Sequence, residues 1–375
     1  MNQEDIARRR LAGQHLTAPT LAGPADVVRR LGAVQAQDYP GAKWAVALRT
    51  RGIVADSVVE QAVADGSIVR THVLRPTWHF VAPADIRWML ALTAPRVSAA
   101  MAHYNRKLEL DAVVFRRSNA ALTRALRDGQ QLTRAELAAV LRRARIGVDG
   151  SQRLGHLMMQ AELDAVVCSG ARRGKQFTYA LLEERVPAAP TLDRDEALLE
   201  LTKRYFATRS PATPYDFAWW SGLTVADATK GIQMASPALE REVLGGRVYW
   251  SDPSAESAST ASLTAHLLPN YDEYFIGFKD RSAIGQRLKS SELVTGGDAL
   301  TAHVVAVDGQ LVGGWRRTLT KQGVAVELKL LTRLTSAEER AVELAARAYG
   351  EFLDLPMQLR GLTGQSAATR RRPVG

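Results

Sequence analysis

The sequence predicts an α+β protein in which three tandem winged-helix motifs precede a small β-rich domain. Three observations support this. A set of short helices followed by a β-hairpin recurs three times, residues 187–190 (PAAP) are typical of a linker, and the last third of the chain turns to strand-forming residues. We expect these parts to form a cleft, with units at 1–85, 86–190, 191–255 and 256–375.

The first unit is predicted to contain three short helices and a hairpin. Residues 4–14 have helical composition, Pro24 opens a second helix with one apolar stripe, and a third helix covers residues 56–65. Residues 68–73 and 77–81 then alternate as two strands. Short helices followed by a hairpin are the pattern of a winged helix.

The same order returns twice. In the second unit Thr133 and Glu136 form a capping box, a helix spans about 151–167, and a hairpin covers 170–179. In the third unit, helices are predicted to start at Asp195, Thr213 and Thr224, and a short wing covers residues 245–250.

The terminal domain is predicted to be a small sheet closed by a helix. Residues 302–307, 311–319 and 324–331 read as strands joined by tight turns, and Ser336 caps the closing helix. The run 370–372 (RRR) is expected to belong to a basic tail.

The charge balance favours a polyanionic partner. Of the 375 residues, 49 are Lys or Arg and 39 are Asp or Glu, which leaves a net charge of +10. Arg-rich surfaces of ordinary proteins give the same balance, so charge alone leaves both interpretations open. Winged helices most often bind DNA, and their repetition favours double-stranded DNA as the partner. We therefore expect the cleft to be DNA-sized.

Composition and motifs also exclude several classes. The single cysteine, Cys168, excludes an intramolecular disulfide, a Cys₄ zinc site and a cysteine-ligated iron–sulfur cluster. The chain has no phosphate-binding loop, no serine nucleophile elbow, no zinc-protease motif and no metal-ligand spacing among its histidines. We therefore expect no cofactor and no metal. Without a transmembrane segment or secretory signal, the expectation is a cytoplasmic protein and a monomer, nucleoid-associated when bound to DNA.

The segment Gln35-Ala36-Gln37, predicted to lie at the end of the second helix, is chemically unusual. In a helix the two amides would lie about 200° apart, whereas in extended backbone residues i and i+2 share a face. Pro40 biases the preceding residue away from helical geometry, so the helix is expected to end nearby. Both amides would then point into one cleft. Two solvated glutamines at a helix end would carry the same spacing.

Three segments together resemble one family, the AlkZ/YcaQ winged-helix DNA glycosylases. They are Gln35-Ala36-Gln37, the hairpin 71–79 (THVLRPTWH) and residues 267–274 (LLPNYDEY). The resemblance covers nearly the whole chain. It implies a catalytic Gln-Φ-Gln motif, which marks the AlkZ-like branch, whereas the YcaQ-like branch has Gln-Φ-Asp. Members excise N7-alkylated purines, and AlkZ-like members are associated with self-resistance in producers of DNA-alkylating antibiotics.

The implied chemistry suits these residue types. Glycosidic hydrolysis passes through an oxocarbenium-like transition state, and an N7-alkylguanine is already cationic, so it departs neutral without a general acid. Gln35 and Gln37 are the expected catalytic residues, because their side-chain oxygens can position water and stabilise positive charge on the sugar. We expect a monofunctional reaction that yields the free base and an abasic site.

Other residues are weaker candidates. Asp38, Thr77 and His79 are candidates for the substrate cleft, with packing or a satisfied turn as the alternative for the last two. Asp272 and Glu273 are adjacent in sequence and are expected to have a structural role, since a glycosidase carboxylate pair must flank one bond. The candidates for DNA binding, for which a solvated turn is the alternative, are Arg75, Arg316, Arg317 and Lys321.

The resulting prediction is a DNA glycosylase for bulky or crosslinking N7-guanine adducts in double-stranded DNA, and an open cleft would accommodate such adducts without flipping them. Two alternatives remain: a non-catalytic winged-helix DNA-binding regulator, which has no use for the glutamines, and a drug-sequestering resistance protein.

Overall fold

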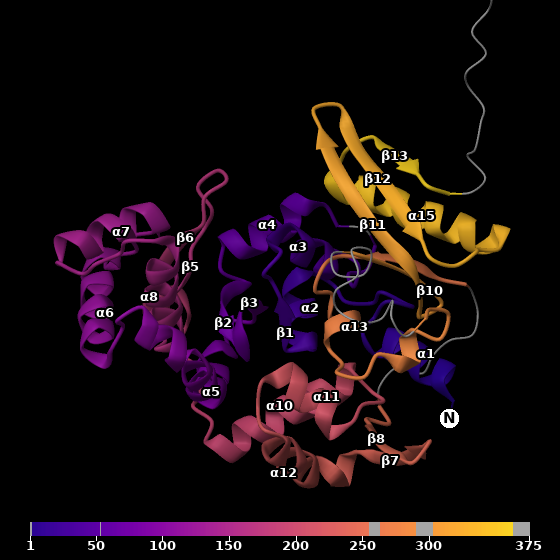
Figure 1. Cartoon of the computed structure of the whole chain (residues 1–375), viewed down its shortest axis with the longest axis horizontal. Helices are drawn as coiled ribbons and strands as arrows, with labels where there is room; N and C mark the ends of the chain where they lie inside the picture. Colours follow the sequence, from indigo (N-terminus) through magenta and orange to yellow (C-terminus); the bar gives the residue numbers. More distant parts are fainter. Residues whose placement is uncertain (1, 53, 255–262, 290–302, 363–375) are drawn as a thin grey trace, which may run out of the picture.

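The computed structural model, which describes residues 2–52, 54–254, 263–289 and 303–362, contains four β-sheets with helices packed between and beside them. The architecture is α+β, as the sequence predicted (Figure 1). The basic run 370–372 and the stretch 255–262 lie outside the described residues.

The first unit contains the predicted helices and hairpin, and two elements that were not predicted. Helix α2 ends at Leu31 because Gly32 adopts a left-handed φ of 79°. A short strand, β1, follows and pairs with β3, giving an antiparallel sheet of order β1-β3-β2. The elements are α1 (Gln3–Gly13), α2 (Pro24–Leu31), β1 (Ala33–Gln35), α3 (Tyr39–Ala47), α4 (Asp56–Ala64), β2 (Val69–Val73) and β3 (Arg75–Val81).

The second unit opens with a long helix that was not predicted, α5, which continues through Pro95. The capping box is confirmed: the Thr133 hydroxyl accepts from the Glu136 N–H, and the Glu136 carboxylate accepts from the Thr133 N–H. The sheet order is β4-β6-β5. The elements are α5 (Ile86–Lys107), α6 (Ala112–Leu126), β4 (Leu132–Thr133), α7 (Arg134–Arg143), α8 (Ser151–Leu163), β5 (Val167–Ser169), β6 (Thr178–Leu181) and α9 (Leu182–Arg185).

The third unit matches the predicted helix starts. Thr213 and Thr224 are both N-caps, each with an aspartate three residues later that completes a capping box. A two-stranded hairpin closes the unit. Its elements are α10 (Arg194–Thr208), α11 (Pro214–Ser221), α12 (Val225–Ala235), the 3₁₀ turn η1 (Ser236–Ala238), β7 (Glu240–Leu244) and β8 (Arg247–Ser251).

The terminal domain is a five-stranded sheet of order β13-β12-β11-β10-β9, and α15 packs against it. The three predicted strands and the closing helix are confirmed, whereas the two outer strands, β9 and β13, were not predicted. β13 alone pairs in parallel. The elements are β9 (Ala265–Leu268), α13 (Glu273–Ile276), η2 (Ser282–Ile284), β10 (Val304–Val307), β11 (Gln310–Thr320), β12 (Gly323–Leu330), α15 (Ser336–Leu353) and β13 (Met357–Arg360).

Buried apolar side chains cross the unit boundaries. One core joins β2, α5, α9, α10 and α11, and therefore draws on the first three units. A second core joins α2, α3 and β3 to the terminal sheet and α15, where Trp44 packs edge-on against Tyr349 with ring centroids 5.1 Å apart. The strand that carries Gln35 thus lies where the cores of all these parts meet.

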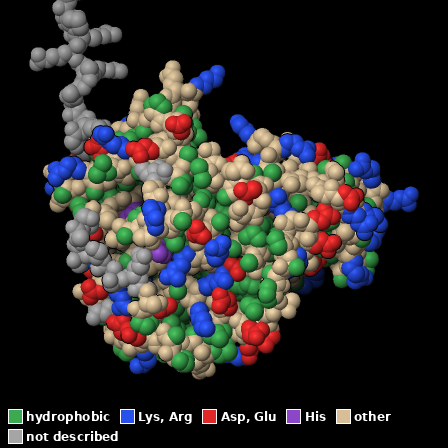
Figure 2. Space-filling model, turned by 180° about the vertical axis from the view of Figure 1, so that it is seen from behind, with side chains coloured by type: hydrophobic (Ala, Val, Ile, Leu, Met, Phe, Trp, Pro, Cys, Tyr) green, Lys and Arg blue, Asp and Glu red, His purple; other side chains and the backbone are tan. Residues whose placement is uncertain are grey.

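Two hairpins project on the same side of the molecule, with α3 and α4 between them (Figure 1). One is β11–β12, and the other is the loop between β5 and β6. Seen from behind, the surface dips between the two projections, and Lys or Arg side chains lie near both tips (Figure 2). Among the helices described, none combines the length and apolar character needed to cross a membrane.

Candidate active site

Gln35 is held rigidly by its backbone while its side chain stays available. Its N–H donates to Glu273 Oε1 at 2.9 Å, and the next residue, Ala36, donates to the Trp78 carbonyl at 2.7 Å. The Gln35 side chain is only 7% exposed, yet its amide makes no hydrogen bond with any described residue. A fixed amide without an internal partner can bind a ligand with little reorganisation.

The carboxylate that holds Gln35 is itself fixed by two buried donors. Glu273 Oε2 accepts from Arg209 Nη2 at 2.7 Å and from Trp220 Nε1 at 2.8 Å. All three side chains have no exposed surface, and the Arg209 guanidinium lies 4.3 Å from the centre of the Trp220 ring. The ion pair therefore fixes β1 from the side opposite β3.

Asp272, the neighbour of Glu273, has a different partner. It caps α13 and accepts from Arg49 Nη2 and Nη1 at 2.8 and 2.9 Å. The two adjacent carboxylates therefore serve separate arginines, which agrees with the structural role expected for both. Arg209 and Arg49 were not identified from the sequence, because no local pattern signals a partner more than 60 residues away.

Gln37 and Asp38 follow β1 at the start of α3. Gln37 is exposed, and its side-chain amide, like that of Gln35, makes no hydrogen bond in the described part of the chain. Asp38 is the N-cap of α3 and accepts from the Gly41 N–H at 3.3 Å. A Cβ at residue 41 would lie 2.5 Å from Asp38 Oδ2, so this cap requires glycine. The motif is thus an extended segment ending in a helix cap, rather than the end of α2.

Three of the hairpin candidates lie on β3, the strand that pairs with Gln35. In the register of the sheet His79 lies opposite Gln35 on β1 and opposite Thr71 on β2. Thr77 and Arg75 precede His79 on β3, where the pairing with β2 shifts register, and the charge of Arg75 acts on the His79 imidazole. This polar row consists of Gln35, His79, Thr71, Thr77 and Arg75. The sequence therefore identified four of its five members; Thr71 was missed.

Burial changes the titration of two members of the row. His79 has no exposed surface, and burial, together with the charge of Arg75, holds the pKa of its imidazole well below the ordinary value. Burial also lowers the pKa of the Arg75 guanidinium, against the opposing effect of the Glu273 carboxylate. His79 is therefore neutral, with Nδ1 2.9 Å from the Thr77 carbonyl oxygen.

The opposite face of the same sheet carries a cation–aromatic cluster that the sequence did not reveal. The Arg70 guanidinium lies 4.3 Å from the ring centre of Trp78 and 4.6 Å from that of Phe177, which comes from the β5–β6 loop. Tyr39, beside the motif, packs edge-on against Phe177 with centroids 5.0 Å apart and donates to Glu60 at 3.0 Å. The cluster ties the motif to the second unit.

The β11–β12 hairpin presents its three predicted DNA-binding residues differently. Lys321 is exposed in the turn. The Arg316 side chain is also exposed, by 78%, but it donates to Glu327 at 2.6 Å. Arg317 is partly buried, 5.8 Å from the ring centre of Tyr349. His303 lies near this arginine, and burial and Arg317 lower the pKa of its imidazole to about 4.

The match of the chain to known proteins decides its family. Residues 28–352 match the model of the family described as "DNA glycosylase AlkZ-like". The chain belongs to this family. It is 29% identical over 359 residues to the interstrand DNA cross-link repair glycosylase of Streptomyces sahachiroi, covering 91% of this chain and 95% of that protein. The structure of the Streptomyces sahachiroi DNA glycosylase AlkZ superposes with a TM-score of 0.78 and 25% identity, over 96% of this chain and 99% of that one.

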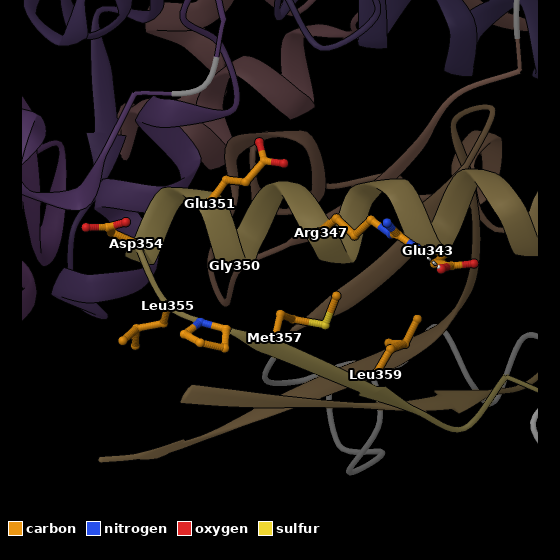
Figure 3. A pocket seen from close by; sticks show the side chains of 9 residues that line it. Glu343, Arg347, Gly350, Glu351, Asp354, Leu355, Met357 and Leu359 are labelled. Atoms are coloured by element: carbon orange, nitrogen blue, oxygen red, sulfur yellow. Dashed lines mark hydrogen bonds and ion pairs between the residues drawn. The ribbon is translucent and has the colours of Figure 1, made fainter. Parts of the chain in front are cut away.

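This AlkZ-like DNA glycosylase also has a cavity unrelated to the motif. It measures about 690 Å³ and lies between α15 and β13 (Figure 3). Met357 and Leu359 point from β13 toward the helix, whereas Glu351 points away. None of the residues predicted from the sequence to form the site lines this cavity. Among the described residues, no group of three His, Cys, Asp or Glu side chains is arranged to hold a metal ion.

Proposed function

We propose that this AlkZ-like glycosylase hydrolyses the N-glycosidic bond of N7-alkylguanines in double-stranded DNA, with Gln35 and Gln37 as its catalytic residues. The observation that carries the proposal is the Gln35 amide: nearly buried, fixed through its backbone by Glu273, and free of hydrogen bonds to described residues. Such an amide is a preorganised dipole, which costs less to bury than a carboxylate.

The reaction requires little from the protein beyond placing water and stabilising charge. Because the N7-alkylated base is cationic, it leaves as a neutral molecule when the C1′–N9 bond breaks. The carbonyl oxygens of Gln35 and Gln37 then face the positive charge that develops on the sugar. Water adds to C1′, and the products are the free base and an abasic site.

The DNA would lie over the dip between the two projecting hairpins. We propose that the helix–hairpin units act as winged helices there and that Arg317 and Lys321 contact phosphate. Arg316 is engaged by Glu327 and would have to exchange that partner to do so. Asp38, Thr77, His79 and Arg75 surround the motif as cleft residues. The open surface suits bulky adducts.

The proposal extends to crosslinked DNA as a substrate. The relative from Streptomyces sahachiroi is named as an interstrand cross-link repair glycosylase. An open site can reach a crosslinked guanine that cannot be flipped out of the duplex. We propose unhooking of N7-linked crosslinks and, in the producing organism, resistance to the alkylating compound.

The test is a single-turnover assay on duplex DNA with one N7-methylguanine, followed by mild alkali to cleave abasic sites. Wild type is compared with Gln35→Ala, Gln37→Ala and the control Gln233→Ala, which replaces an exposed glutamine of α12. We expect cleavage by wild type and the control, and a loss of at least 100-fold in each motif variant. Equal cleavage by all four proteins would refute the glutamine assignment.

A second substrate separates the alternatives. If wild type leaves N7-methylguanine intact, a duplex with a bulky or crosslinking N7 adduct is tested in the same way. Inactivity on both substrates with retained duplex binding would favour a DNA-binding regulator. Binding of the free alkylating compound in the absence of DNA would favour drug sequestration.

A further inference from the structure

The pairing of β1 with β3 brings the side chains of Gln35 and His79 close together. The Gln35 N–H is directed away from β3, toward Glu273, whereas the Ala36 N–H donates to β3. Gln35 and His79 therefore form a non-hydrogen-bonded antiparallel pair, the type in which Cα atoms approach to about 4.5 Å and side chains lie closest. On its other side, His79 faces Thr71.

The row beside Gln35 contains polar atoms without hydrogen-bond partners in the described part of the chain. They are Nε2 of His79, the hydroxyl oxygens of Thr71 and Thr77, and Nε and Nη2 of Arg75. His79 and Thr71 have no exposed surface at all. Buried polar atoms of folded proteins nearly always have a partner, so such a group of them indicates a bound polar ligand.

The chemistry of these atoms identifies the ligand as water. Nδ1 of His79 faces a carbonyl oxygen and must carry the proton, so Nε2 is an acceptor. Arg75 can only donate, and the threonine hydroxyls can do either. An anion is disfavoured by the lone pair of Nε2, and a metal cation by the guanidinium. Water both donates and accepts, and it is small enough for a site between side chains.

We propose that Nε2 of His79 accepts a hydrogen bond from the nucleophilic water and that His79 acts on this water together with Gln35. The inference rests on the proposed glycosylase function and extends it from the two glutamines to the strand behind them. Thr71, whose hydroxyl has no hydrogen-bond partner among the described residues, holds the water on the far side of the imidazole.

The step balances with these groups alone. The C1′–N9 bond breaks and its electron pair stays with the base, which departs neutral. The water oxygen forms the new bond to C1′ and becomes strongly acidic. Its proton moves along the hydrogen bond to Nε2 of His79 and then to bulk solvent after the products leave. A neutral imidazole suffices as acceptor because a protonated hydroxyl group is far more acidic than an imidazolium.

The test compares His79→Leu, which removes the acceptor, with His79→Gln, which restores a polar group near Nε2. The control is His266→Leu, which removes another buried histidine, one that bonds to the Leu16 carbonyl. Three quantities are measured for each protein: the single-turnover rate at saturating enzyme on N7-methylguanine duplex, the Kd for undamaged duplex, and the thermal midpoint.

We expect His79→Leu to lower the rate about 100-fold or more. His79→Gln should recover at least part of it, with Kd unchanged within about twofold in both variants. A His79→Leu protein that folds and cleaves like the control would overturn the proposal, and so would rates that fall only in proportion to DNA binding. An inactive wild type would refute the proposed function itself, which is a separate result.

A second variant covers the case in which His79→Leu does not fold. Thr71→Val has nearly the same shape and removes only the hydroxyl next to the imidazole. We expect its single-turnover rate to fall about tenfold with the thermal midpoint unchanged or raised, because a buried hydroxyl without a protein partner contributes nothing to stability. An unchanged rate in a folded Thr71→Val protein would overturn the proposed water site.

Discussion

The buried pair of Arg209 and Glu273 predicts a large loss of stability from a change of one atom. Glu273→Gln removes the charge, and the new amide N–H₂ faces the donors of Arg209 and Trp220 in place of an oxygen. Both partners of the ion pair have no exposed surface, so the guanidinium would be left buried without compensation. Breaking such a pair from one side costs about 3–5 kcal/mol.

The same substitution at an exposed pair is the matched control. Glu327 accepts from Arg316, whose side chain is 78% exposed, and Glu327→Gln should cost no more than about 1 kcal/mol. Guanidinium unfolding followed by tryptophan fluorescence measures both losses. The expected difference, at least about 2 kcal/mol, corresponds to a factor of about 30 in the unfolding equilibrium. Equal losses in the two variants would refute the argument that burial of the pair controls its contribution.

Three further predictions concern other parts of the molecule. Replacing both Arg317 and Lys321 by alanine should reduce the slope of log Kd against log salt for duplex DNA by up to about 1.8, and an unchanged slope would exclude both from phosphate contact. The pKa of His303 is about 4 in the folded chain and higher in the unfolded chain. The neutral imidazole therefore contributes fully to stability above about pH 6.5, and this contribution is lost as the pH falls toward 4. His303→Gln should lose less stability than wild type between pH 7 and pH 4.5, as measured by urea unfolding. Cys168 is fully buried, which raises the pKa of its thiol to about 12, and a thiol reagent should modify it only when the chain unfolds; rapid labelling of the native protein would contradict this.

Local signals made most of the fold predictable. Caps such as Thr133, Thr213 and Thr224 mark helix starts with side chains that lie three residues apart, and all three are confirmed. Strand β1 was missed because three residues are too short to show an alternating pattern, and β1 forms only by pairing with β3.

The residues of the candidate site that belong to local motifs were predictable from the sequence, whereas their distant partners were not. The motif, together with the hairpin that resembles the family, directed attention to Gln35 and His79, and the register places them opposite each other. Glu273, which holds the Gln35 backbone, lies 238 residues further along the chain. Arg209, which fixes Glu273, comes from a different unit, and both contacts exist only in the folded chain. Sequence spacing carries no information about such pairs.

The core that runs through β2, α5, α9 and α11 has a consequence for how this chain can be divided or recombined. Although the helix–hairpin units look like interchangeable modules in sequence, each supplies part of a shared interior. A fragment that ends at the 187–190 linker would expose the surface that Phe217 and Trp220 cover, and it would also lack the arginine and the carboxylate that fix Gln35. The smallest piece able to keep the motif in place is nearly the whole protein, so a unit exchanged between relatives must bring a matching share of that interior with it.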